Sequence, residues 1–416
     1  MTDTAARVRP LVATSAVTII GSDDEAISAA RTLATEFAVD AAERDLNRIL
    51  PAAEVDVMSA AGLFAITVPR EYGGADVRAS TLAEVFRLLA TADPNIAQIP
   101  HSHFVYVNLL RLAATSRQRE QLFGEILAGG RLANAQSERT SKTVREIQTI
   151  LKPIGSGGFV LRGTKYYCTG ALFADRIPVL ARLDDPNQVA GLPEGEYVAY
   201  VPTATAGLTV EDDWDALGQR LTASGTVRLD DVQVAAEWLV PRDQAFEQPH
   251  SYGALAQLLH AAIDVGIARG ALDEAAAFVN TKSRPWYEAE VERAVDDPLV
   301  VQRFGELAVE VAAAESVLRT AGERLDRALT MPHEQAATDA SIAVATAKVL
   351  GEKASIATSS ALFEVSGTRA AAAELNLGRH WRNARTHTLH DPIRWKYHHI
   401  GRHTLSGIAP PRTAVI

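Results

Sequence analysis

The segment GGFVLRGTKYYCTG, residues 157–170, interrupts a chain whose sequence pattern is otherwise helical. Its valine, tyrosine and threonine residues alternate with polar ones and it ends in glycine, as β-strands and hairpins do. Two similar runs follow, EYVAYVP at 196–202 and GTVRLDDVQV at 225–234. The middle of the chain is therefore predicted to be a β domain.

On both sides of this region, apolar residues repeat at three- and four-residue spacing, which is typical of amphipathic helices. From Phe304 to Leu325 a single apolar stripe continues without a break, as in a helical bundle or a subunit interface. Further helices are expected at 24–48, 82–91, 117–128, 335–365 and 392–405. The predicted fold class is α+β multidomain, with a helical domain at 22–136, a β domain at 137–245 and a helical bundle at 246–416.

The composition of the chain excludes several classes of partner. The 416 residues carry a formal net charge of −10, which argues against nucleic acid and anionic membrane because both require a basic face. The one cysteine, Cys168, cannot form an internal disulfide, so nothing requires an oxidising compartment. The apolar stretch 11–20 is too short to span a bilayer and is interpreted as an arm or docking strand. A cytoplasmic location is expected.

Familiar catalytic motifs are missing from the sequence. There is no glycine-rich dinucleotide or P-loop signature, no HExxH and no GxSxG. The histidine pairs at 101–103 and 387–390 could converge on a metal, but apart from Asp391 no carboxylate or third histidine follows at a diagnostic spacing. No metal site is expected.

The end of the first predicted strand is a candidate flavin-binding turn. A hydroxyl from Thr169 could hydrogen-bond the flavin, and Gly170 would allow the backbone to approach closely. A plain strand end with a turn glycine explains the same residues. The run NAQSE at 134–138 is likewise either a ring-binding loop or a helix C-cap.

A basic cluster lies between 363 and 392. Four arginines and three histidines occur there with little opposing charge in the surrounding sequence. We interpret the cluster as a site for an anion such as a phosphate or a reduced flavin, rather than as helix ends and surface pairs.

Taken together, these segments resemble the flavin monooxygenase branch of the acyl-CoA dehydrogenase superfamily. The similarity is carried by PREYGG (69–74), KYYCTG (165–170), DDWDALGQRLTASGTV (212–227), SRPW (283–286) and HWRNARTHTLHDP (380–392). The segment 98–100 and the longer runs YCTGALF and HWRNARTHTLHDPIRWKYH are similar to oxidoreductases of sulfur acquisition that are linked to dimethyl sulfone use. The resemblance extends from about residue 22 to 405.

This resemblance implies an N-terminal helical domain, a central β-barrel and a C-terminal four-helix bundle, assembled as a homotetramer. It also implies reduced FMN supplied by a separate flavin reductase, and oxygen transfer through a flavin C4a-hydroperoxide. Thr169 would give a hydrogen bond near flavin N5, and His390 would assist proton delivery. Arg284 would reach the flavin of a neighbouring subunit. The implied cofactor contacts are Asn134, Ala135, Gln136, Ser137, Glu138, Arg139, Lys165, Tyr166, Tyr167, Cys168, Thr169, Arg284, Thr368, Arg369 and His390.

The implied substrate contacts are Gln98, Ser102 and His103. Gln98 and Ser102 stand where the dibenzothiophene enzymes of the family have a histidine and a tyrosine. This difference disfavours dibenzothiophene and favours a smaller sulfone or sulfide.

Two other functions remain open at this point. An FAD-dependent acyl-CoA dehydrogenase would need a carboxylate to remove the substrate α-proton. The usual glutamate is absent from THTLHDP at 386–392, although Glu247 could serve instead. A flavin-binding partner without turnover is the third class.

Overall fold

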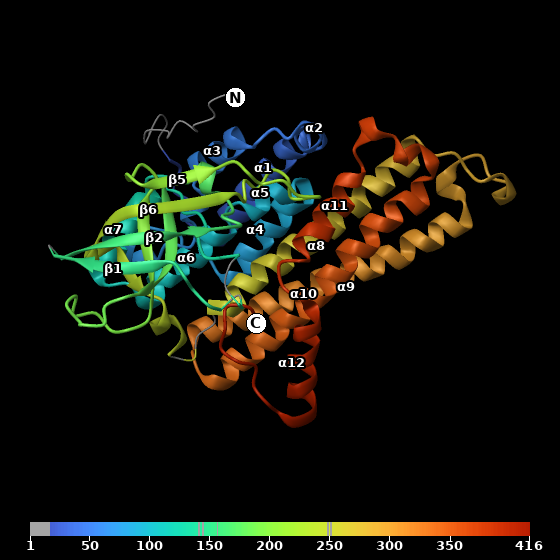
Figure 1. Ribbon diagram of the computed structural model, residues 1–416. Coiled ribbons are helices and arrows are strands. Elements are labelled where there is room, and N and C mark those ends of the chain that lie inside the picture. The colour runs from blue at the N-terminus through green and yellow to red at the C-terminus, as the bar shows by residue number, and fades with distance from the viewer. Residues whose placement is uncertain (1–16, 140–141, 144, 156, 248, 250–251) are drawn as a thin grey trace.

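The computed structural model describes residues 17–416 except 140–141, 144, 156, 248 and 250–251, so most of the apolar segment 11–20 lies outside the described residues. The chain runs from helices through a β-sheet to long helices, in the predicted order (Figure 1). The N-terminal helices are α1 (Asp23–Ala38), α2 (Ala41–Asn47), α3 (Ala52–Ala60), α4 (Ala79–Ala92), α5 (Pro94–Gln98), α6 (His101–Ala113) and α7 (Ser116–Leu127).

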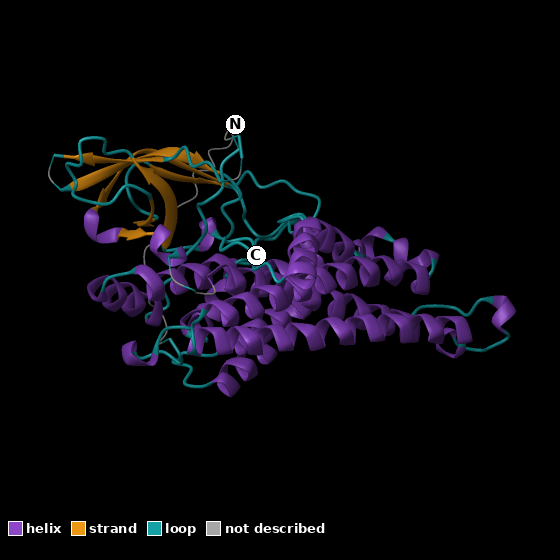
Figure 2. Cartoon of the chain, turned by 90° about the horizontal axis from the view of Figure 1, so that it is seen from below, coloured by secondary structure: helices purple, strands orange, loops and turns teal. Residues whose placement is uncertain are grey.

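The sheet has seven strands in the order β5-β6-β2-β1-β3-β4-β7, and Figure 2 shows it curving over one end of the helical layer. All its pairings are antiparallel except β1 with β3. Its inner face has a core of its own, which includes Leu161, Val179, Val201 and Val232. The strands are β1 (Ile150–Ile154), β2 (Gly158–Lys165), β3 (Arg176–Leu183), β4 (Glu196–Pro202), β5 (Leu208–Glu211), β6 (Thr226–Ala235) and β7 (Leu239–Pro241).

The C-terminal part is built on three long helices that pack side by side, with α4 of the N-terminal part packed against two of them. The two helical parts share one core, in which Phe86 of α4 meets Leu258 and Leu318 of the bundle. The C-terminal helices are α8 (Tyr252–Thr281), α9 (Pro298–Thr330), α10 (Glu334–Ser366), α11 (Gly378–His387) and α12 (Ile393–Ser406).

The apolar stripe predicted from Phe304 to Leu325 is confirmed, because its members in α9 are buried apart from the partly buried Phe304. The single helix expected at 24–48 is wrong, since α1 ends at Ala38 and a second helix begins at Ala41. This break allows α2 to bury Arg44, whose guanidinium is ion-paired with Asp93 at the start of α5.

Helix α8 is buried on nearly all its faces, so its apolar residues do not form a single stripe. Among the described residues it is the one helix long and apolar enough to cross a membrane, but 94% of its most apolar window is buried inside the protein. It is thus the central helix of the bundle, and its polar residues are enclosed by its neighbours.

Candidate active site

The structure brings the two candidate flavin-binding segments together. The N–H of Asn134 donates to the carbonyl of Thr169 at 3.2 Å, and the N–H of Tyr166 donates to the carbonyl of Ser137 at 2.9 Å. The side-chain amide of Asn134 also donates to the carbonyl of Tyr167 at 3.2 Å. Residues 134–139 and 165–169 therefore form one continuous surface next to the sheet.

Several side chains of this surface are already engaged within the protein. Lys165, which is fully buried, donates to Glu138 at 2.6 Å and to the carbonyl of Gln136 at 3.2 Å. Burial raises the pKa of the Cys168 thiol to about 12, which makes it unreactive. Ala135 is buried and its carbonyl accepts from Leu180 in β3. These residues can meet a flavin mainly through their backbone.

The turn that carries Thr169 has an unusual backbone. Tyr167 has φ = 59°, a left-handed conformation that is uncommon for a bulky residue and is often found at functional sites. The guanidinium of Arg139 lies over its ring and that of Tyr166, at 4.9 and 4.5 Å. Gly170 has φ = 77°, and a Cβ there would lie 3.2 Å from the carbonyl of Ile99. The backbone between α5 and α6 therefore packs closely against Gly170.

Thr169 is the first member of a chain of three hydroxyls. Its Oγ1 lies 2.8 Å from Ser224 Oγ, which lies 2.7 Å from Thr222 Oγ1. Thr222 donates to the carbonyl of Gln219 at 3.0 Å, so Ser224 must donate to Thr222 and Thr169 to Ser224. In this arrangement the Thr169 hydroxyl can only accept a hydrogen bond from a ligand. It can donate to a ligand only if the hydrogen bonds among the three hydroxyls reverse their direction. This reversal would not leave the Gln219 carbonyl unpaired, because Trp214 Nε1–H also donates to it at 2.7 Å.

A second group of polar side chains is a stack of histidine rings. The ring of His260 in α8 lies between His101 and His390, with ring centroids 3.9 Å apart on each side. His101 donates its Nε2–H to the carbonyl of Ala256 at 2.9 Å, and burial lowers the pKa of His101 to about 3. His260 was not predicted from the sequence, because a lone histidine in an apolar helix gives no signal of function.

The His260 ring continues into a buried network of charges. Its Nδ1 lies 3.1 Å from Nε2 of His387, and Nδ1 of His387 lies 2.5 Å from Asp264. Lys348 of α10 donates to Asp264 at 2.9 Å, and both side chains are fully buried. Burial alone would raise the pKa of Asp264. The neighbouring Lys348 and His387 together have a larger effect in the opposite direction, so the pKa of Asp264 is below its usual value. Asp264 is therefore a carboxylate that holds His387 in place.

His390 differs from His260 in its exposure and its partners. Its side chain is 46% exposed, and its Nδ1 lies 3.2 Å from the Asp391 carboxylate. Asp391 is buried and also pairs with Lys396 at 2.6 Å. His390 is thus at the mouth of the histidine cluster, where solvent reaches it.

Two hydrogen bonds connect the loop that carries Thr222 and Ser224 to α5 and to α11, the helix that also carries His387. The side chain of Asn95 in α5 accepts from the N–H of Leu221 at 3.1 Å. The N–H of Gln219 donates to Asn383 of α11 at 2.7 Å. We therefore treat Thr169, His260 and His390 as parts of one site.

The predicted substrate residues have different environments. His103 is fully buried, donates Nε2–H to the carbonyl of Phe64 at 2.7 Å and accepts the N–H of Leu132 at 3.0 Å. Both ring nitrogens are used, so neither is left for a substrate. Ser102 is buried, and Gln98 has a buried carbonyl oxygen without a partner. Among the described residues, other buried polar atoms without a hydrogen-bond partner include atoms of Gln219, Gln257, His260 and, next to Lys348, Glu352.

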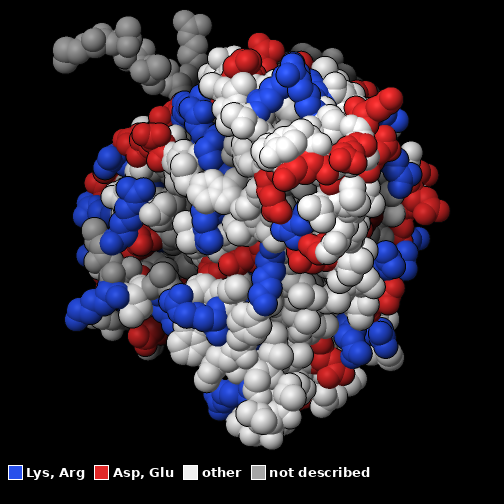
Figure 3. All heavy atoms as spheres, turned by 90° about the vertical axis from the view of Figure 1, so that its right-hand side faces the viewer, with Lys and Arg blue, Asp and Glu red and all other residues white. Residues whose placement is uncertain are grey.

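Arg284, Thr368 and Arg369 lie away from the rest of the predicted contacts. Ser283 donates to the carbonyl of Ser366 at 3.2 Å, which brings the exposed loop after α8 beside the turn after α10. Figure 1 shows this end of the bundle opposite the sheet, and on the face viewed in Figure 3 basic and acidic side chains are interspersed.

The interpretation of residues 363–392 as one anion-binding cluster is wrong for its middle part. His380 contacts Glu274 at 2.8 Å, and Arg379 pairs with the same carboxylate. Arg382 pairs with Asp45 at 2.5 Å. The opposing charges come from helices distant in sequence, and local sequence could not show them.

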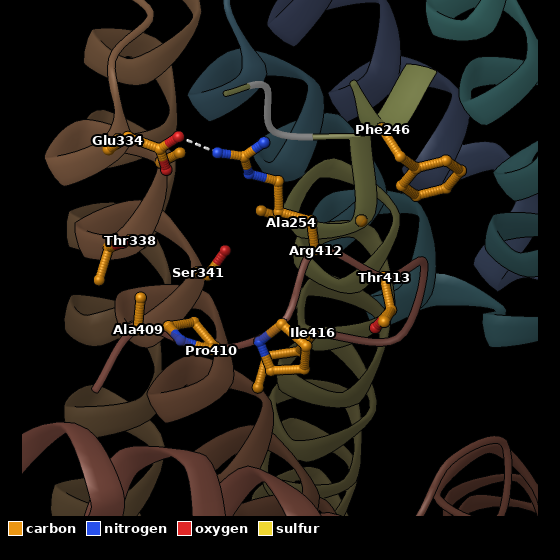
Figure 4. Close-up of a pocket in the computed structure, with 13 residues that line it drawn as sticks. Phe246, Ala254, Glu334, Thr338, Ser341, Ala409, Pro410, Arg412, Thr413 and Ile416 are labelled. Atoms are coloured by element: carbon orange, nitrogen blue, oxygen red, sulfur yellow. Dashed lines mark hydrogen bonds and ion pairs between the residues drawn. The ribbon is translucent and has the colours of Figure 1, made fainter. Parts of the chain in front are cut away.

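Two further features of the structure bear on ligand binding: the arrangement of metal-ligating side chains and a cavity near the C-terminal tail. In the described part of the chain, no group of three or more His, Cys, Asp or Glu side chains is placed to hold a metal ion. A cavity of about 40 Å³ lies where the C-terminal tail crosses α8 and α10, lined by residues that include Ser341 and Arg412 (Figure 4). The Arg412 side chain is ion-paired with Glu334 there, and this cavity is not part of the histidine site.

Comparison with known proteins places these features in a family context. The models for the N-terminal, middle and C-terminal domains of acyl-CoA dehydrogenases match residues 23–130, 134–232 and 258–395. The probable FMNH2-dependent monooxygenase SfnC of Pseudomonas putida is 30% identical over 92% of this chain and 96% of its own length.

Two solved structures are also similar. FMN-bound TdsC from Paenibacillus sp. A11-2, a dibenzothiophene monooxygenase, has a TM-score of 0.87 and 30% identity, covering 94% of this chain and all of TdsC. The methanesulfinate monooxygenase MsuC from Pseudomonas fluorescens has a TM-score of 0.86 and 30% identity, covering 94% of this chain and 99% of MsuC.

Proposed function

Because the chain belongs to the flavin-dependent monooxygenase branch of the acyl-CoA dehydrogenase superfamily, we propose that it oxidises a small organosulfur compound, a sulfone or sulfide, using oxygen and reduced FMN. A separate flavin reductase supplies the FMN, and both proteins work in the cytoplasm in sulfur acquisition. Bound reduced FMN provides the electrons that activate oxygen. The observation that carries the proposal is the buried His260, whose ring lies against His101 and His390 and whose Nε2 has no partner among the described residues.

The charges at the site argue against an acyl-CoA dehydrogenase. Such an enzyme needs a free carboxylate as base. Asp264 and Asp391 are each paired with a lysine, and Glu352 lies 3.6 Å from the Lys348 ammonium that also pairs with Asp264. Glu247 is exposed and lies before the start of α8, outside the buried cluster.

The unpartnered amides favour a small substrate with polar oxygens. Gln98 and Gln257 each leave a buried amide oxygen without a partner, and both amide atoms of Gln219 are unpartnered. Since an unpaired buried polar group costs about 1–3 kcal/mol, these groups are expected to bind a ligand. The side-chain N–H group of Gln219 can donate to an oxygen of a sulfone or sulfinate, whereas the amide oxygens of Gln98 and Gln257 only accept and would pair with a donor. The similarity to a methanesulfinate monooxygenase agrees with a small substrate.

The flavin site is expected to need two subunits. The ring would contact residues 134–139 and 165–169 of one chain, including Thr169. Arg284, Thr368 and Arg369 would hold the phosphate, because guanidinium groups bind phosphate with two parallel hydrogen bonds. Along α8, Thr281 lies about 30 Å from His260, which is farther than one FMN can reach. The phosphate of each flavin is therefore assigned to the arginines of a neighbouring subunit in a homotetramer.

The proposed reaction predicts a specific product and cofactor. Mixed with reduced FMN, isotopically labelled oxygen and methanesulfinate or dimethyl sulfone, the purified protein should transfer one labelled oxygen atom to the organic product. Mass spectrometry measures this transfer, and calorimetry should show tighter binding of FMN than of FAD. Reduction of bound FAD by an acyl-CoA thioester, with no oxygen transfer, would instead establish a dehydrogenase.

Mixing two variants tests the shared site. Arg284→Ala with Arg369→Ala removes the phosphate contacts, while Thr169→Val damages the ring side. If each site combines two subunits, mixed assemblies at equal ratio should recover about one quarter of the wild-type sites. Activity assays after co-refolding measure the recovery, with each variant refolded alone as the control. Recovery no greater than the sum of the separate variants would show that each chain builds its own site.

A further inference from the structure

Three buried residues form a hydrogen-bonded line that ends on an unpartnered atom. Asp264 and His260 lie four residues apart on α8, so they share one face of the helix. His387 from the end of α11 bridges them, at 2.5 Å from Asp264 and 3.1 Å from His260. Nε2 of His260 is buried and has no partner in the described structure.

The direction of each hydrogen bond in this line follows from the charge on Asp264. An ionised carboxylate only accepts, so Nδ1 of His387 carries the hydrogen. In a neutral His387 the Nε2 atom is then an acceptor, and Nδ1–H of His260 donates to it. His260 therefore presents a bare lone pair at Nε2.

The surroundings of His260 keep a proton from remaining on its ring. Burial lowers its pKa well below the usual value, and the nearby ammonium of Lys348 lowers it further, as would a proton on any of the neighbouring histidine rings. His387, in contrast, lies directly against the Asp264 carboxylate. Other charged groups lie nearby. Glu352 lies 3.6 Å from Lys348. Asp391 contacts His390 at 3.2 Å and pairs with Lys396 at 2.6 Å.

We propose that Asp264, His387 and His260 are a proton relay that opens at His260 Nε2 and exchanges one proton with the molecule bound at the site. On uptake, His260 Nε2 receives a proton, its Nδ1 gives a proton to His387 Nε2, and the imidazolium of His387 rests against Asp264. Delivery is the reverse of these transfers, after which both rings are neutral again. The relay thus stores one proton on His387 while His260 shows an N–H donor.

One stored proton matches the stoichiometry of the proposed function, on which this role rests. Monoanionic reduced FMN, oxygen, a sulfur substrate and one proton give oxidised FMN, the substrate with one added oxygen, and one water. The exposed His390 cannot hold that proton away from solvent, whereas the fully enclosed His387 can. His260 and His387 are accordingly positioning and relay residues, and His390 lies at the entrance.

The hydrogen positions can be measured in the flavin-free protein. With histidine labelled by ¹⁵N, long-range proton–nitrogen spectra at neutral pH should show His260 protonated at Nδ1 and His387 protonated at Nδ1. Asp264→Asn should reverse both tautomers, because the asparagine amide donates to His387 and leaves His260 with Nε2–H. An Nε2–H tautomer of His260 in the unaltered protein would overturn the relay, and this measurement requires no variant to fold.

Turnover gives the second readout. His260→Gln should slow oxygen transfer by about 10²- to 10⁴-fold, as expected for loss of an acid–base group, and should raise hydrogen peroxide released per FMN reoxidised. His398→Gln replaces an exposed histidine of α12 and should leave this ratio unchanged. Wild-type rate and coupling in His260→Gln would refute the relay. If no organosulfur compound is oxidised although the tautomers are as stated, the proposed function fails and the relay stands.

Discussion

Replacing Lys348 with methionine is expected to lower the free energy of unfolding by about 3–5 kcal/mol, because it leaves a buried carboxylate without its cation. Lys348 and Asp264 have no exposed surface and their charged atoms are 2.9 Å apart. The remaining partner of Asp264 is the ring of His387, whose Nδ1 lies 2.5 Å from the carboxylate. Thermal and urea unfolding followed by circular dichroism measure the loss.

A matched control lies on the same helix. Lys353, five residues along α10, is exposed, and Lys353→Met should change stability by no more than about 0.5 kcal/mol. Adding Asp264→Asn to Lys348→Met should recover part of the loss, since both members of the pair are then neutral. An unchanged unfolding midpoint in Lys348→Met alone would mean that Asp264 is not charged in the folded protein.

Replacing Thr169 with valine keeps the shape of the side chain but removes the first hydroxyl of the chain that runs through Ser224 to Thr222. Loss of one hydrogen bond to a charged or transient group costs about 1.5–3 kcal/mol, or about 10- to 150-fold in rate. We expect the loss in oxygen transfer and in coupling, with FMN affinity changed much less. Rapid mixing and a peroxide assay measure both quantities.

Two variants separate this effect from a loss of structure. Thr203→Val removes a hydroxyl that donates to the carbonyl of Asp175 in the β domain, and should leave coupling normal. Ser224→Ala keeps Thr169 but removes its partner, and should cause a smaller loss of coupling. If Thr169→Val couples normally, the hydroxyl has only a structural role.

Local sequence patterns were sufficient to predict elements that depend on the spacing of apolar residues within one segment. The alternation in residues 157–170 predicted β2 because its side chains face opposite sides of the sheet. The stripe from Leu307 to Leu325 predicted α9 because one face of that helix packs on its neighbours. The long C-terminal motif at 380–392 is specific enough to indicate the family, and the family implies the order of the three domains.

The active site depended on contacts between segments that are distant in sequence. His260 and His387 are 127 residues apart, and the charges that neutralise Arg379 and Arg382 come from other helices. Lys348 of α10 and Asp264 of α8 are buried together as an ion pair, and Asp264 in turn holds the ring of His387. The sequence by itself determined which elements form and to which family they belong. Only the tertiary structure decided which polar side chains are enclosed together, because their protonation depends on burial and on neighbours that no local pattern records.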